Sequence, residues 1–352
     1  MVLIISLIGL LNLYSTEFNE AFASQDLVYV KQMKWIVSGL VFMTAALCVD
    51  YRFISRYAYL IYGISILLLV VVFFYGYATR GSQRWILLGG FSLQPSELMK
   101  LTLILALSKY FDDHRNVLSY RLKDLAVPFL ITLVPFLMIM KQPDLGTALI
   151  LFFIFTSLVL FIGIHWKSLA WSVLTALLLI PSGWFFLKDY QKGRIMTFIN
   201  PDRDPLGAGY HVIQSIIAIG SGGITGKGFL KGTQTQLRFL PERHTDFVFS
   251  VFAEEWGFLG GMVLLILFMI LILWGLKIAL HARDYSGSLI AVGVTALIFW
   301  EVFINIGMVL GILPVVGIPL PFISYGGSSM LVLMTSVGLL INVSMRRFIL
   351  RP

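Results

Sequence analysis

The sequence predicts an all-α polytopic membrane protein with about ten transmembrane helices and one large extracytoplasmic loop, in a single domain over residues 1–352. Composition carries this prediction: 58% of the residues are hydrophobic, only 12% are charged, and the mean hydropathy is +0.89. A soluble domain has roughly 25% charged residues. A soluble fold of this length cannot bury so much apolar surface, so the composition indicates that lipid surrounds the chain.

Hydrophobic stretches of the right length give the individual spans, because a helix crosses a bilayer in about 20 apolar residues. The predicted spans are 1–14, 33–49, 57–76, 95–111, 124–140, 145–163, 167–187, 257–280, 287–312 and 329–345. The first is short, and Ala21-Phe22-Ala23 resembles a signal-peptide cleavage site. A basic segment before it is missing and polar residues follow Tyr14, so a permanent span is favoured over a signal peptide.

Lysine and arginine in the short loops indicate the orientation, because cytoplasmic loops are enriched in them. One set of loops and span ends holds twelve: Arg52, Arg56, Lys109, Arg115, Arg121, Lys123, Lys167, Lys277, Arg283, Arg346, Arg347 and Arg351. The alternate set holds six: Lys31, Lys34, Arg80, Arg84, Lys100 and Lys141. We therefore expect the first set, and both termini, to be cytoplasmic.

This orientation places every segment rich in glycine, proline and polar residues on the outer side. These segments are 77–100, 141–147, 188–250 and 313–329. The cytoplasmic loops are short and chemically plain. Any chemistry is therefore expected at the outer leaflet.

The long loop 188–250 combines glycine with positive charge. It contains nine glycines, including those of 220–223 and 226–228, and the basic residues Lys192, Arg194, Arg203, Lys227, Lys231 and Arg238. Glycine exposes amide donors to an anion, so a phosphate-bearing ligand would suit the loop. It is not a Walker loop, because no Ser or Thr follows the lysine. An ordinary surface or re-entrant loop with turn glycines is the alternative.

Ionisable side chains then gather where the loop meets the next apolar stretch. Glu242, Arg243, His244 and Asp246 lie within five residues. Partial burial can tune such groups, so they are candidates for a reaction centre, with interfacial anchoring and helix capping as the alternative. Glu254 and Glu255, further in, are interpreted as a hydrogen-bonded structural pair.

Charges also occur at membrane depth, where they are costly and usually face a cavity or each other. Glu97 and Lys100 share a helix face at i and i+3. Either they brace the bundle, or Glu97 holds Lys100 toward a phosphate. Glu301, with Asn305 one turn on, favours a helix–helix hydrogen bond.

Three further features lie near the outer ends of spans. Asp144 could cap the next helix or bind substrate or metal. Arg84, beside Trp85, could be an interface anchor. Pro319, Pro321 and Gly326-Gly327 break the chain before the last span, which indicates a re-entrant turn at a cavity.

Composition also limits the function classes. The net charge of +8 and the single cysteine, Cys48, come without a basic run interleaved with aromatics. Nucleic-acid binding, an internal disulfide and a Cys-rich metal site are therefore not expected.

At this point the sequence resembles the SEDS family, named for shape, elongation, division and sporulation. The motifs that carry the resemblance run in order over nearly the whole chain: Gly81-Ser82-Gln83-Arg84-Trp85-Ile86, Gln94-Pro95-Ser96-Glu97, Asn200-Pro201, Asp204-Pro205, Gly207, Gly209-Tyr210-His211, Gln214-Ser215, Ala218 to Gly223, Gly226-Lys227-Gly228, Leu240-Pro241-Glu242, Asp246-Phe247 and Pro319 to Ser329. Gly232-Thr233-Gln234 and Ser250 to Glu255 are similar to the elongation branch of the family.

The resemblance implies a peptidoglycan glycosyltransferase that polymerises lipid II beside a class B penicillin-binding protein, which crosslinks the strands. The family's essential aspartate maps onto Asp246, the expected general base, with undecaprenyl pyrophosphate as leaving group. The expected substrate-binding residues are Arg84, Glu97, Lys100, Asp144, Arg194, His211, Gln214, Lys227, His244 and Ser324. A divalent cation, Mg²⁺ or Mn²⁺, is a further expectation with unknown ligands, and no organic cofactor is expected.

Two other functions remain open at this stage. A lipid II flippase would need polar features on the cytoplasmic side too, and here they are one-sided. A non-catalytic scaffold that activates its penicillin-binding partner would tolerate loss of Asp246. For the partner's membrane anchor we expect the span 287–312, through Gly293, Gly307 and Gly311.

Overall fold

The computed structural model describes residues 1–18, 27–79, 82–88, 91–115, 120–183, 185, 189–201, 207–237, 239, 240 and 242–347. Helices coincide with all ten predicted spans: α1 (Val2–Glu17), α2 (Val28–Cys48), α4 (Ala58–Tyr75), α5 (Pro95–Asp113), α6 (Ala126–Lys141), α7 (Leu145–Ile162), α8 (Trp166–Gly183), α12 (Val248–Leu280), α13 (Tyr285–Val309) and α14 (Gly327–Arg346). Within the described residues, α4, α7, α12, α13 and α14 are long and apolar enough to cross a membrane on those grounds alone. The polytopic all-α prediction is confirmed.

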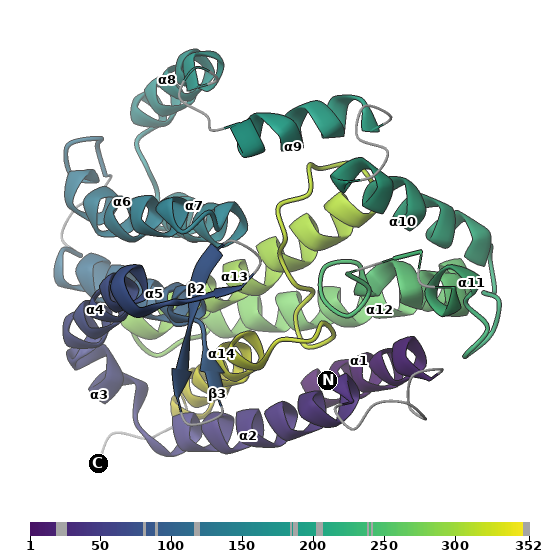
Figure 1. Cartoon of the computed structure of the whole chain (residues 1–352). Helices are drawn as coiled ribbons and strands as arrows, with labels where there is room; N and C mark the ends of the chain where they lie inside the picture. Colours follow the sequence, from purple (N-terminus) through teal and green to yellow (C-terminus); the bar gives the residue numbers. More distant parts are fainter. Residues whose placement is uncertain are drawn as a thin grey trace.

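The bundle is built around α13. This helix contacts α5, α7, α12 and α14, and most of it is buried (Figure 1). On one side α2 and α14 pack along each other, with α1 beside them, and on the other side α4, α5, α6 and α7 form a second group. In Figure 1, α8 stands apart from these groups, and its Trp171, Leu177 and Leu178 are exposed.

A polar face anchors α1 in the bundle. Asn12 donates from Nδ2 to the Val248 carbonyl (2.9 Å), and the Ser15 hydroxyl donates to Glu255. Glu17, at the end of α1, accepts from the backbone amides of Val28 and Tyr29 at the start of α2. These contacts favour the permanent span over the signal peptide.

The three glycines of α13 that were expected to face the partner's anchor also take part in packing inside the chain. A Cβ on Gly293 would lie 2.5 Å from Ile104, one on Gly307 would lie 2.7 Å from Leu313, and one on Gly311 would lie 2.9 Å from Ile216. The choice of the span 287–312 for the partner's anchor stays a prediction.

Two polar segments are more ordered than the sequence suggested. Residues 77–93 include an antiparallel sheet of β1 (Tyr77–Thr79), β2 (Ser82–Leu88) and β3 (Phe91–Leu93) in that order. The long segment 188–250 carries α9 (Asp189–Ile199), α10 (Ala208–Gly222) and the short α11 (Thr233–Gln236). A short α3 (Tyr51–Arg56) joins α2 to α4.

The start of α12 is also earlier than predicted, at Val248 instead of residue 257. Gly257 marks a kink inside the helix, with a φ of +66° that favours glycine. Glu254 and Glu255 made the first turns look too polar for a span. The structure accommodates them because neighbouring groups bind both carboxylates.

Between α13 and α14 the chain returns into the bundle as irregular backbone, as predicted from its prolines and glycines. Residues 316–326, here called the re-entrant segment, bury Val316, Ile318, Leu320 and Ile323. Such backbone is tolerated at membrane depth only when protein groups satisfy its hydrogen bonds. Those groups turn out to surround Asp246.

Candidate active site at Asp246

Asp246 lies in a compact turn immediately before α12. The backbone amides of Thr245 and Phe247 both donate to the Glu242 carbonyl at 3.2 Å, and the Thr245 hydroxyl donates to the Glu242 carboxylate at 3.2 Å. Asp246 itself is half-buried. The turn therefore presents one carboxylate at the edge of a buried region.

The re-entrant segment and α13 together fix this turn at three consecutive carbonyls. The Tyr325 amide donates to His244 O (2.8 Å), and the Ser324 hydroxyl donates to Thr245 O (2.6 Å). Asn305, on α13, donates to Asp246 O (3.0 Å). The Ser324 hydroxyl also accepts from the Leu320 amide, so this expected substrate ligand has a structural role.

Gly317 lies directly against the Asp246 carboxylate. A Cβ on this glycine would be 3.3 Å from Asp246 Oδ2, and its φ of +76° favours glycine. The sequence analysis did not single out Gly317. The only available signal was its place between the last two spans, just before the prolines.

Two histidines and a glutamine approach the same region. His244 Nδ1 is 2.9 Å from the Thr16 hydroxyl of α1. On α10, the His211 ring lies 6.1 Å from the Phe247 ring, and its buried Nδ1 has no hydrogen-bond partner within the described part of the chain. Gln214 is half-buried one turn along α10. The Ser215 hydroxyl holds this helix to the Val309 carbonyl at 2.6 Å.

A second polar group surrounds Asp144 at the start of α7. Asp144 caps α7 through the Thr147 amide (3.3 Å), which confirms the capping prediction. Its Oδ2 accepts from Gln94 (3.1 Å). The Arg84 guanidinium lies 3.8 Å from Asp144 Oδ1 and donates to the carbonyls of residues 142 and 143.

Gly146, at the start of α7, connects this group to the active site. A Cβ there would lie 2.8 Å from Val316 O and 3.4 Å from Gly317 O. The backbone around Gly317 thus contacts both the start of α7, which Asp144 caps, and the turn that carries Asp246.

Lys100 is not free to meet a phosphate in this structure. It is 2% exposed and lies 2.7 Å from Glu97 and 2.5 Å from Glu301, which is fully buried. The predicted pairing of Glu97 with Lys100 is confirmed. The predicted interhelical bond of Glu301 is confirmed as well, because it joins α13 to α5.

Lys227 is likewise engaged by a carboxylate. Its ammonium lies 2.7 Å from the buried Glu254 Oε1 and 2.7 Å from the Thr233 hydroxyl. Glu254 also accepts from the Gln234 amide. Glu254 and Glu255 therefore have structural partners, as predicted, but each binds its own partners.

The glycine-rich motif beside Lys227 does not present free amides to an anion. The amides of Lys227 and Gly228 donate to the carbonyls of Glu254 and Glu255 at 3.0 Å each. In return, the Phe258 amide donates to Gly223 O at 2.9 Å. These glycines therefore pack against the kink of α12. They act as turn glycines, which was the alternative to a phosphate-binding loop.

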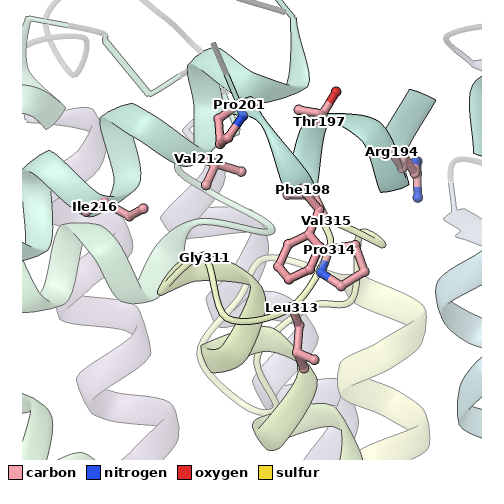
Figure 2. Close-up of a pocket in the computed structure, with 10 residues that line it drawn as sticks. All are labelled: Arg194, Thr197, Phe198, Pro201, Val212, Ile216, Gly311, Leu313, Pro314 and Val315. Carbon is pink, nitrogen blue, oxygen red and sulfur yellow. The ribbon is translucent and has the colours of Figure 1, made fainter. Parts of the chain in front are cut away.

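Arg194 lies at a different place, on α9. It lines a small, mostly apolar cavity of about 60 Å³ with Phe198, Pro314 and Val315 among others (Figure 2). Ligand pockets usually measure ~300–1,000 Å³, so this cavity does not hold a disaccharide. Of five cavities lined by described residues, none brings the expected substrate-binding cations Arg84, Lys100, Arg194 and Lys227 together with Asp246.

The described residues contain no group of three His, Cys, Asp or Glu side chains that could hold a metal ion. Asp246 and Glu242 are the carboxylates of the turn. Mg²⁺ often needs only one or two protein carboxylates when substrate phosphates complete its shell. The donor set therefore fits a cation that is shared with a pyrophosphate better than a closed protein site.

Comparison with known proteins shows which family the chain is similar to. The family model described as "Cell cycle protein", which covers FtsW, RodA and SpoVE, matches residues 1–348. The chain is 45% identical over 318 residues to the peptidoglycan glycosyltransferase MrdB of Escherichia coli K12, covering 89% of this chain and 84% of MrdB.

Solved structures agree over nearly the full length. One, described as a peptidoglycan synthase complex that coordinates polymerization and crosslinking, has a chain with a TM-score of 0.84 and 33% identity, covering 99% of this chain and 96% of that one. The rod shape-determining protein RodA of Thermus thermophilus, as an aspartate-to-alanine variant, has a TM-score of 0.73 and 30% identity, with coverage of 99% and 96%.

Proposed function

This chain belongs to the FtsW, RodA and SpoVE family of cell-cycle proteins and is a multi-pass bacterial membrane peptidoglycan glycosyltransferase, and we propose that Asp246 is its general base. The observation that carries the proposal is the fixation of one half-buried carboxylate by three consecutive carbonyl contacts and by Gly317. A base must be held within hydrogen-bond reach of the proton that it removes. This turn provides such a position.

The reaction needs one base and a stabilised leaving group. The 4-hydroxyl of an acceptor GlcNAc attacks C1 of a donor MurNAc, and Asp246 takes the hydroxyl proton. The bond from C1 to the pyrophosphate oxygen breaks with inversion, and undecaprenyl pyrophosphate leaves with the electron pair. An inverting transfer requires no covalent sugar–enzyme intermediate. Ionised aspartate only accepts hydrogen bonds, so it can receive the proton directly.

For substrate binding we retain the groups that border the Asp246 turn. Arg84 and Asp144 lie at the start of α7, which contacts the re-entrant segment through Gly146. His244 lies in the turn, His211 lies beside Phe247, and Gln214 follows His211 one helical turn along α10. Arg84 is the favoured cation for the pyrophosphate because guanidinium binds phosphate through a planar fork. Arg194 is proposed for the approach of the substrate along α9.

We assign a supporting role to Glu97, Lys100, Lys227 and Ser324, whose polar atoms are engaged inside the protein. If a divalent cation takes part, Asp246 and substrate pyrophosphate would hold it. It would neutralise charge on the leaving group.

The natural substrate and partner are proposed as lipid II and a class B penicillin-binding protein. The similar synthase complex coordinates polymerization with crosslinking, and a partner that crosslinks would complete this chain's chemistry. Rod shape and cell elongation are the corresponding physiological role.

We also propose that both termini are cytoplasmic and that residues 188–250 face outward, from the lysine and arginine bias. A cysteine at exposed Leu237, in a Cys48→Ser background, should react with an impermeant thiol reagent in intact cells. Reaction only after lysis would contradict this orientation.

The direct test is polymerisation of purified lipid II, with and without the partner. Asp246→Asn keeps the side-chain shape and removes its basicity. We expect it to fold and bind lipid II and partner but to lose at least ~10²-fold in rate. Asp113→Asn, on an exposed ion pair with Lys109, is the matched control and should be fully active.

His244, two residues before Asp246, is the alternative base, because histidine is the residue most often used for general acid–base catalysis. His244→Ala should nevertheless keep measurable activity. Near wild-type polymerisation by Asp246→Asn would exclude Asp246 as the base. Polymer that forms only through the partner, whatever stands at position 246, would support the scaffold. Lipid II translocation without polymerisation would support the flippase.

A further inference from the structure

Asn305 is a buried polar residue with an unusual pair of partners. It lies on α13 with 0% exposure, where the sequence indicated a helix–helix hydrogen bond. Instead, its side-chain nitrogen donates to two loop carbonyls, Asp246 O at 3.0 Å and Ile318 O at 2.7 Å. The amide nitrogen has two protons, so both are used.

The two carbonyls belong to the two backbone segments that meet at the Asp246 carboxylate. One is the carbonyl of Asp246 itself. The other belongs to Ile318, the residue after Gly317, which approaches Asp246 Oδ2. One side chain therefore ties together the turn that carries the carboxylate and the backbone that borders it.

The helix that carries Asn305 is itself anchored nearby. Glu301, one helical turn earlier, lies 2.5 Å from the Lys100 ammonium, which also contacts Glu97 on α5. All three side chains are buried. Asn305 thus links the Asp246 turn to the part of α13 that the ion pairs of Lys100 hold in place.

We propose that Asn305 is a positioning residue that sets the location of the Asp246 carboxylate relative to the substrate. This inference rests on the proposed role of Asp246 as base. Asn305 touches no reacting atom, because both of its donors are bound to backbone carbonyls. It acts by holding the Asp246 turn and the re-entrant segment in a fixed position relative to each other.

Loss of this link should affect turnover more than binding. A displacement of about 1 Å in a reacting group can cost ~10²-fold in rate. Apart from His244, which shares the turn, the groups proposed to bind substrate lie on other elements and keep their positions. We therefore expect Asn305→Leu to lower kcat by about 10- to 100-fold, while the lipid II concentration at half-maximal rate changes by less than about 3-fold.

Asn342 offers a matched control with the same chemistry at the other end of the bundle. It is 1% exposed, and its side-chain nitrogen donates to the carbonyls of Ala46, Leu47 and Val49 around the end of α2. Asn342→Leu also leaves buried carbonyls without a donor. It should lower stability as Asn305→Leu does, but leave kcat per folded molecule unchanged.

The experiment measures polymerisation against lipid II concentration for the full chain with its partner, normalised to folded protein from thermal unfolding in detergent. Asn305→Ser, which keeps one donor, should be intermediate and covers the case in which Asn305→Leu does not fold. Wild-type kcat in both Asn305 variants, or an equal loss in Asn342→Leu, would overturn the positioning role. An active Asp246→Asn variant would instead show that the base assignment had failed.

Discussion

In the buried cluster of Glu97, Lys100 and Glu301, loss of the lysine should destabilise the fold much more than loss of one acid. It contains two carboxylates and one ammonium, each at most 4% exposed. Replacing Lys100 with methionine leaves two carboxylates without their cation. Removing one partner of a buried ion pair costs about 3–5 kcal/mol, because an uncompensated charge stays buried.

Removal of one acid should be far milder. In Glu301→Gln, Lys100 keeps its 2.7 Å contact with Glu97, and the glutamine oxygen can still accept a hydrogen bond. The expected cost is about 1 kcal/mol, as for a typical hydrogen bond. Lys109→Met is the control for losing a lysine, because Lys109 pairs with Asp113 at the surface, where such pairs contribute ~0.3–0.5 kcal/mol.

The assay is reversible denaturation in mixed micelles followed by far-UV circular dichroism. The order of destabilisation should be Lys100→Met, then Glu301→Gln, then Lys109→Met. Equal losses for Lys100→Met and Glu301→Gln would show that the cluster does not carry a surplus acid. A loss in Lys100→Met as small as that in Lys109→Met would show that burial is not what makes the pair important.

Three further predictions concern glycines and a tyrosine. Gly226→Ala should abolish recovery of monodisperse protein by size exclusion, because its Cβ would lie 2.1 Å from Glu255 O at a φ of +81°, whereas Gly220→Ala meets nothing within 4 Å and should behave as wild type. Gly317→Ala should lower polymerisation per folded molecule about 10-fold, because its Cβ would press on Asp246; Gly163→Ala, with a φ of +87° and open space, imposes the backbone strain without that contact and should stay active. Burial, and then the hydrogen bond to Asp284, raise the pKa of Tyr51 to about 12 from its ordinary value of 10. The stability that Tyr51 contributes is therefore present below pH 10 and lost between pH 10 and 12, and Tyr51→Phe should flatten that part of the unfolding curve measured against pH.

The spans could be predicted from sequence because the bilayer imposes a local rule. A backbone in lipid must satisfy its own hydrogen bonds, so each crossing is a helix with a continuous apolar stretch. All ten stretches became helices. The rule failed at the start of α12. Glu254 is paired with Lys227 and Glu255 accepts a hydrogen bond from Ser15, and both partners lie more than 20 residues away, outside any local sequence window.

The candidate site residues likewise divide into those that a local sequence pattern could identify and those that depend on distant contacts. Asp246 was recognised because its motif is contiguous in the chain, and Asp144 was recognised as a cap because capping involves residues only three apart. The sequence could not show whether Lys100 and Lys227 bind phosphate or pair with a carboxylate of the chain. A lysine in either role looks the same in the sequence. Distance to Glu301 and Glu254 decides between them.

The sequence by itself determined the membrane class, the ten helices, the family and the position of the proposed base, because each depends on composition or on residues close together in the chain. Only the tertiary structure decided that Asn305 and Gly317 border Asp246, and that the glycine motif supports a kink. These contacts join residues about 30 to 70 positions apart. Except for the Asp246 carboxylate beside Gly317, their partners are backbone atoms, which are the same in every residue and leave no mark in the sequence.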